Sequence, residues 1–174
     1  MNMKNKQIRN ITFSALLIAV GLVLPQLFHA VGGQTAGTIF LPLHIPVFVA
    51  GLLLGPAMGG SIGLLLPFVS SLMTGMPPAL RLPFMMVELC AYGVISGLIM
   101  KQTKNALLSL IVAQVGGRIF YALSLIIAAN ILKIPAPALT AFLMGITNGL
   151  PGLGIQWVLI PLLVKLLKDR VEYE

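Results

Sequence analysis

The sequence contains very little charge and almost no acid. Of its 174 residues only 4 are Asp or Glu, and charged residues of both signs make up 9%. Three of the acids, Asp169, Glu172 and Glu174, lie near the C-terminus, which leaves Glu88 as the single acid before them. A soluble domain of this size presents far more polar surface to water, so the composition excludes that class.

The motifs of the common enzyme classes are missing as well. The chain has no GxxxxGK[ST] phosphate-binding loop, no HExxH and no GxSxG, and its one cysteine, Cys90, has no partner for an intrachain disulfide. Catalysis in a membrane needs a nucleophile, a metal or a pair of acids. We therefore expect a protein that is not an enzyme and that holds neither a metal nor another cofactor.

Long apolar segments are what the sequence does contain. Hydrophobic residues make up 58% of the chain, and one helix needs about 20 apolar residues to cross a bilayer. The sequence therefore predicts an all-α integral membrane protein, a single domain over residues 1–174. Six transmembrane helices are expected at about residues 10–31, 39–55, 57–75, 82–101, 106–131 and 138–168.

Basic residues predict the orientation of these spans. The net charge of +7 would suggest a nucleic-acid partner in a soluble protein, but here it indicates topology. Eight of the 11 Lys and Arg residues fall before span one, between spans four and five, or after span six. Only Arg81 and Lys133 fall in the opposite loops. The positive-inside rule then places both termini in the cytoplasm, with the chain in a bacterial-type cell membrane.

Glycine and proline predict where the helices break. The stretch "LLGPAMGG" around Pro56 predicts a tight reversal between spans two and three. The stretch "NGLPGLG", residues 148–154, predicts a kink or a break inside span six.

A few polar side chains lie among the apolar ones, and groups of this kind usually face a cavity or a partner because they are costly in lipid. Glu88 and Tyr92 share one face of span four, and Arg118 and Tyr121 share one face of span five. Asn148 reaches about the same depth in span six as Arg118 does in span five. We expect a pocket that opens outward. The polar residues expected to line this pocket are His44, Glu88, Tyr92, Arg118, Tyr121, Asn148 and Gln156.

Structural roles for the same residues stay open. Glu88 and Arg118 would also form an ion pair that only fixes the register of two helices. Ordinary helix packing would account for Tyr92 and Tyr121. His44 is either a hydrogen-bonded structural residue or a ligand contact.

Small residues recur at intervals of four along several spans. This spacing lets helices approach closely in lipid. It occurs at Gly51, Gly55, Gly59 and Gly63, at Gly93 and Gly97, and in span one at Ala15 and Ala19.

The order of these elements resembles a known family. The segments "FLPLHIPVFVAGLLLGP" and "SSLMTGMPPALRLPFMMVELCAYGVISGL", set among six spans, are similar to the substrate-binding S components of energy-coupling factor (ECF) vitamin transporters. The resemblance covers nearly the whole chain and is strongest from Gly37 to Leu98.

The resemblance implies a role in transport. Such a component binds a vitamin with high affinity near the outer face of the membrane. It associates with a membrane-embedded coupling protein, the T protein, and two cytoplasmic ATPases. In the family an AxxxA pair on the first helix contacts the coupling protein, and Ala15 and Ala19 match that pair. The family's gating loops would be residues 29–38, "HAVGGQTAGT", and 74–81, "TGMPPALR".

The resemblance leans towards pantothenate as the vitamin. Arg81 or Arg118 would neutralise its carboxylate, and Glu88, Asn148 and His44 would bond its hydroxyl and amide groups. Folate, cobalamin, pyridoxine and a thiamine precursor are the alternatives.

Two other functions match parts of the sequence. A small autonomous carrier would use Glu88 for proton coupling, and a structural membrane subunit would bind no ligand. The halves 1–87 and 88–174 share no pattern, which disfavours the carrier because many carriers are built from repeats.

Overall fold

The computed structural model describes residues 3–171. Within that range the regular structure is helical: α1 (Met3–Phe40), α2 (His44–Leu54), α3 (Pro56–Thr74), α4 (Leu82–Thr103), α5 (Ala106–Ile126), the π-helical segment η1 (Ile127–Leu132) and α6 (Leu139–Val171). Six segments are long and apolar enough to cross a membrane: Gln7–Gly33, Thr35–Leu54, Pro56–Thr74, Leu82–Thr103, Ala106–Leu132 and Leu139–Lys168. The prediction of an all-α protein with six spans is confirmed.

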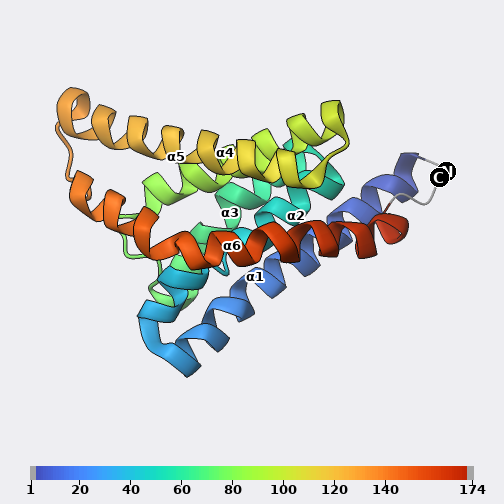
Figure 1. Ribbon diagram of the computed structural model, residues 1–174, viewed down its shortest axis with the longest axis horizontal. Coiled ribbons are helices and arrows are strands. Elements are labelled where there is room, and N and C mark those ends of the chain that lie inside the picture. The colour runs from blue at the N-terminus through green and yellow to red at the C-terminus, as the bar shows by residue number, and fades with distance from the viewer. Residues whose placement is uncertain (1–2, 172–174) are drawn as a thin grey trace.

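α1 contains the first span and the beginning of the second. Its backbone leaves helical geometry at Gly32 and Gly33, and Gly33 has a φ of 64°, a conformation that glycine adopts without steric cost. The chain then turns back as a short helix that ends at Phe40 (Figure 1). The expected loop over residues 29–38 is therefore wrong in extent, because only the two glycines interrupt the helix.

Two further breaks lie where the sequence predicts them. Gly55, with a φ of 94°, separates α2 from α3, and Pro56 occupies the start of α3, where a missing N–H group costs no helical hydrogen bond. Gly75, with a φ of 72°, ends α3 and begins the loop that leads to Arg81.

The sequence predicts a kink or a break at residues 148–154, and the structure shows no break there. α6 continues as one helix through this stretch with Pro151 inside it. Gly152 packs against the backbone of Ile39 and Phe40, so the end of α1 supports the helix where the proline removes a hydrogen bond.

Glycine permits the closest contacts between helices. α4 packs against α2, α3 and α5, while α1 packs against α6 and α2. A Cβ atom on Gly59 would lie 2.6 Å from the Cα of Gly51 and 2.6 Å from the carbonyl oxygen of Gly93. A larger residue at Gly59 would push these helices apart, which confirms the expected packing role of the spaced glycines.

The two ends of the helix bundle differ in charge. The start of α1, the end of α6 and the turn between α4 and α5 lie at one end (Figure 1), and these segments contain the eight basic residues predicted to be cytoplasmic. The loop from Gly75 to Arg81 and the connection between η1 and α6 lie at the other end. The candidate site lies at this second end.

Candidate functional site

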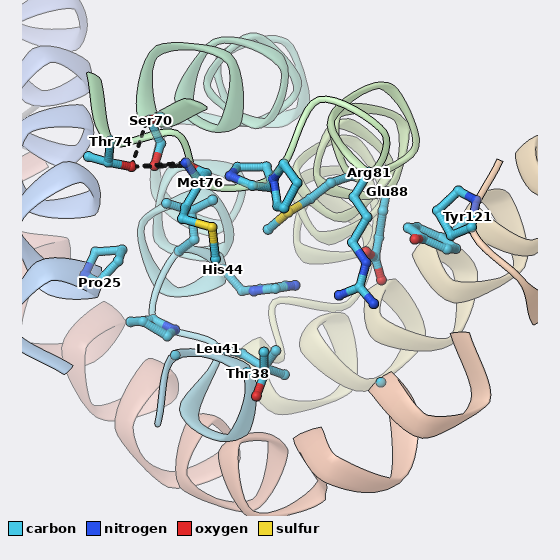
Figure 2. A pocket seen from close by; sticks show the side chains of 18 of the residues that line it. Pro25, Thr38, Leu41, His44, Ser70, Thr74, Met76, Arg81, Glu88 and Tyr121 are labelled. Atoms are coloured by element: carbon cyan, nitrogen blue, oxygen red, sulfur yellow. Dashed lines mark hydrogen bonds between the residues drawn. The ribbon is translucent and has the colours of Figure 1, made fainter. Parts of the chain in front are cut away.

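A cavity of about 200 Å³ lies at the less basic end of the bundle. Its walls come from α1, the turn over residues 41–43, α3, the following loop, α4, α5, the η1–α6 connection and α6. Figure 2 shows Ser70, Thr74 and Met76 along one side and Arg81, Glu88 and Tyr121 along another. Residues from almost every helix therefore meet around one space.

An ion pair joins α4 to α5 in the cavity wall. Nη1 of Arg118 lies 3.0 Å from Oε1 of Glu88. The Tyr92 hydroxyl donates to the same oxygen at 2.7 Å, from one helical turn further along α4. The Glu88 side chain is 4% exposed and the Arg118 side chain 19%. A carboxylate so deeply buried needs a partner of opposite charge, and Arg118 supplies it.

Arg81 brings a second cation to the cavity. It is the last residue before α4, it lines the cavity, and its side chain is exposed (Figure 2). Within the described part of the chain, the salt bridge from Arg118 to Glu88 leaves no carboxylate paired with Arg81. The charged groups of the wall therefore sum to one positive charge, since Arg81 and Arg118 are opposed by Glu88 alone.

His44 opens α2 and lines the cavity with its ring almost fully buried, at 4% exposure. The Leu41 carbonyl approaches the ring, but neither Nδ1 nor Nε2 has a partner at hydrogen-bond distance and angle among the described residues. The ring packs on Tyr92, with centroids 5.5 Å apart. Two unpaired nitrogens in a buried wall are costly unless something else bonds them.

Side chains of α3 hold the loop that follows it. The Ser70 hydroxyl donates to the Met76 carbonyl at 2.8 Å, and the Ser71 hydroxyl donates to the Pro77 carbonyl at 2.8 Å. The Met76 N–H group donates to the Thr74 hydroxyl at 3.2 Å. The Met76–Pro77 peptide bond is cis. The loop is thus fixed to the end of α3 and forms one wall of the cavity.

An aromatic wall faces this polar side. Tyr121 stacks on Phe142 of α6, with ring centroids 5.2 Å apart and planes 11° apart. Phe84 of α4 packs on the same tyrosine at 6.2 Å. α4, α5 and α6 are therefore joined beside the cavity by rings, and a ligand there would meet one apolar wall.

A buried amide pair supports the turn before α2. The Gln114 amide donates to Gln156 Oε1 at 3.1 Å, and the Trp157 indole donates to Gln114 Oε1 at 2.7 Å. The Gln156 amide in turn donates to the Leu41 carbonyl at 3.4 Å. Leu41 lines the cavity, so contacts between α5 and α6 fix part of its wall.

Four of the polar residues predicted from the sequence lie in the cavity wall: His44, Glu88, Arg118 and Tyr121. Arg81, which the resemblance to the family adds, lies there as well, whereas Gln156 does not. Tyr92 lies behind the wall, where it bonds Glu88. Asn148 does not line the cavity; it is exposed on α6.

Several polar wall residues are absent from the sequence-based set. They are Gln26, His29, Thr38, Ser70 and Thr74. Ser70 and Thr74 are four apart on α3, a spacing that does place them on one face. Hydroxyl groups are cheap in a membrane helix, so they attract less notice than a charge. Within residues 3–171, no three His, Cys, Asp or Glu side chains gather as metal ligands.

Ala15 and Ala19 lie away from the cavity, on the exposed side of α1. Large apolar neighbours on this helix are also exposed, Leu16 at 56% and Val23 at 55%. Such a face is open to lipid or to another membrane helix.

These features define a class of protein: a multi-pass membrane protein whose helices surround a small cavity near one end, mostly apolar but with charged side chains in its wall. Over residues 9–164 the chain matches the family described as ECF transporter, substrate-specific component, and it belongs to that family. Components of this family bind substrate for a transporter in which they partner with a T protein and ATPases, and they are not enzymes. No curated protein and no solved structure gives a significant match.

Proposed function

We propose that the chain is the high-affinity subunit that binds a small vitamin with a single carboxylate, pantothenate being the best candidate. The observation that carries this proposal is the charge of the cavity wall. Arg118 is matched by Glu88, whereas Arg81 lines the cavity with no carboxylate beside it among the described residues. A ligand with one negative charge would neutralise this wall.

The other vitamins match this wall less well. Pyridoxine and thiamine precursors carry no carboxylate for Arg81, and folate carries two. A cavity of about 200 Å³ is below the usual range of about 300–1,000 Å³ for larger ligands, which disfavours cobalamin. Pantothenate also has two hydroxyl groups and an amide, which suit the serine, threonine and histidine of the wall.

The carboxylate is proposed to bind Arg81 at the mouth, and the hydroxyl and amide groups to lie deeper, near His44 and Glu88. The exposed face of α1 around Ala15 and Ala19 is proposed to receive the coupling protein, because small side chains let a partner helix approach closely. Residues 78–81, the part of the loop after α3 that this helix does not hold, are proposed to move when ligand enters.

Mass spectrometry of the small molecules released from purified, denatured protein tests the proposal most directly. We expect a compound with one carboxylate. Equilibrium binding should then show tight association with pantothenate and at least tenfold weaker association with pantothenol, in which a hydroxymethyl group replaces the carboxylate. Equal affinity for the two compounds would contradict the proposal.

Arg81→Gln is expected to weaken pantothenate binding by about ten- to a hundredfold, because a hydrogen bond to a charged group contributes about 1.5–3 kcal/mol. Pantothenol binding should change little. Lys133→Gln is the matched control: it removes a positive charge from the same end of the molecule but not from the cavity wall. If the two variants weaken binding equally, Arg81 acts only by long-range electrostatic attraction and does not contact the ligand.

A further inference from the structure

The two oxygens of the Glu88 carboxylate have different surroundings. Oε1 receives the Arg118 guanidinium at 3.0 Å and the Tyr92 hydroxyl at 2.7 Å. Apart from Arg118, no described residue has a hydrogen bond or ion pair with Oε2. Oε1 thus receives both of the close contacts given for this carboxylate.

The Glu88 carboxyl group faces the cavity. Buried side-chain atoms without a hydrogen-bond partner among the described residues include Oγ of Ser14 and the two ring nitrogens of His44. Oε2 of Glu88 is not among these atoms, and the Glu88 side chain retains 4% of its surface. Because Glu88 lines the cavity and is otherwise packed among helices, this surface opens to the cavity (Figure 2).

We infer that Glu88 Oε2 accepts a hydrogen bond from an O–H or N–H group of the ligand, and that this contact selects ligands that combine one anionic group with such a donor. The inference rests on the proposed function. An ionised carboxylate offers only acceptors, so it attracts a ligand donor and repels a second ligand acceptor. A cavity wall with a free acceptor beside two arginines therefore distinguishes hydroxy or amide carboxylates from simple carboxylates and from dicarboxylates.

The geometry separates this role from a purely positioning one. Arg118 and Tyr92 both donate to Oε1, so in Glu88→Gln they would hold the amide oxygen at that place. The amide NH₂ group would then stand where Oε2 was, and an acceptor would become a donor. The contacts that orient the side chain would survive while the ligand contact would be reversed.

The test compares pantothenate with three analogues, each lacking one donor: the two deoxy compounds and the compound methylated at the amide nitrogen. Binding of each is measured to wild type, Glu88→Gln and Tyr92→Phe. For wild type we expect one analogue to bind roughly ten- to a hundredfold more weakly than pantothenate. In Glu88→Gln the ratio of the Kd of that analogue to the Kd of pantothenate should fall to about three or less, whatever the affinity for pantothenate itself.

Tyr92→Phe is the control, because it removes a partner of Oε1 and leaves Oε2 unchanged. In Tyr92→Phe the ratio of the Kd of the analogue to the Kd of pantothenate should stay within twofold of the wild-type ratio. If the ratio collapses in Tyr92→Phe as well, or persists in Glu88→Gln, Glu88 only positions Arg118 and the inference is wrong. If wild type binds no pantothenate, the proposed function fails and the inference fails with it.

The double variant Glu88→Gln/Arg118→Gln covers the case in which the single variant does not fold. It replaces the ion pair by two neutral amides and leaves no buried charge unpaired. The same loss of the analogue ratio is expected, and a ratio equal to that of wild type overturns the inference.

Discussion

His44 combines deep burial with two ring nitrogens that no described residue bonds. An unpaired polar group of this kind destabilises a fold by about 1–3 kcal/mol relative to a paired one. Such a cost is commonly retained at binding sites, where a ligand supplies the missing partner. The position of His44 in the cavity wall makes this the natural explanation.

His44→Leu is therefore expected to increase the free energy of unfolding of the ligand-free protein in detergent by about 1 kcal/mol. This gain would be seen as a higher melting temperature. The same variant should bind pantothenate at least about tenfold more weakly, because the ligand loses a hydrogen bond in a dry site. Thermal unfolding with and without pantothenate measures both effects on one sample.

Ser14→Ala serves as the matched control for this experiment. Its hydroxyl oxygen is also buried and unpaired, but Ser14 does not line the cavity. We expect a similar gain in stability and an unchanged affinity. A His44→Leu protein that is less stable than wild type, or that binds pantothenate normally, would show that the ring has a structural role.

The ion pair in the cavity wall is one of the two roles that the sequence left open for Glu88 and Arg118, and the structure contains it. Glu88 and Tyr92 are four apart on one face of α4, and the Tyr92 hydroxyl and the Arg118 guanidinium meet at Glu88 Oε1. The depth of a residue in the membrane predicts less well whether it lines the cavity, because depth does not give the rotation of a helix about its axis. Asn148 illustrates the difference, since contacts of α6 with its neighbours turn this residue away from the cavity.

At the scale of whole elements, the two ends of α1 differ in what surrounds them. Its C-terminal part lines the cavity through residues such as Pro25 and Thr38. Its N-terminal part exposes Ala15 and Ala19 together with larger apolar side chains. In the proposed function, ligand binding and partner docking therefore use separate stretches of one helix.

Ala15→Trp is expected to leave pantothenate affinity within about twofold of wild type and to abolish uptake by cells that contain the complete transporter. An indole on an exposed face disturbs no internal packing but keeps a partner helix at a distance. Binding by purified protein and uptake by cells are the two measurements.

Ala30→Trp is the matched control, because the same exposed change on the same helix lies about 16 Å from Ala19 at 1.5 Å per residue. Uptake should persist in that variant. Loss of affinity in Ala15→Trp would mean that the alanine packs the fold and does not receive a partner.

The limits of individual helices were harder to predict than their number. Hydrophobic length fixes the count of spans, because each must cover the same bilayer. Glycine-rich stretches do not by themselves decide between a loop and a bent helix. Tertiary support decides in α6, where the end of α1 packs against Gly152 and lets the helix continue through Pro151. In α1 the backbone of Gly32 and Gly33 takes up the turn.

At the scale of the whole molecule, most of the basic residues lie at one end and the cavity lies at the other. The segments with Lys101, Lys104 and Lys165 gather where α1 begins and α6 ends (Figure 1), whereas the cavity opens near Arg81. If the basic end faces the cytoplasm, as the positive-inside rule predicts, the cavity receives its ligand from outside the cell. An importer requires that orientation.

Cysteine labelling of intact cells tests this topology in a Cys90→Ala background. Ala79 is exposed in the loop beside the cavity, and Gln102 is exposed at the end of α4 near Lys101. A membrane-impermeant maleimide should label Ala79→Cys in whole cells and label Gln102→Cys only after the membrane is broken. Charge predicts this result because translocating a basic segment is opposed by the membrane potential, at about 2.3 kcal/mol per charge for each 100 mV. The reverse labelling pattern would place the cavity on the cytoplasmic side, where a ligand-free binding subunit could not capture a vitamin arriving from outside.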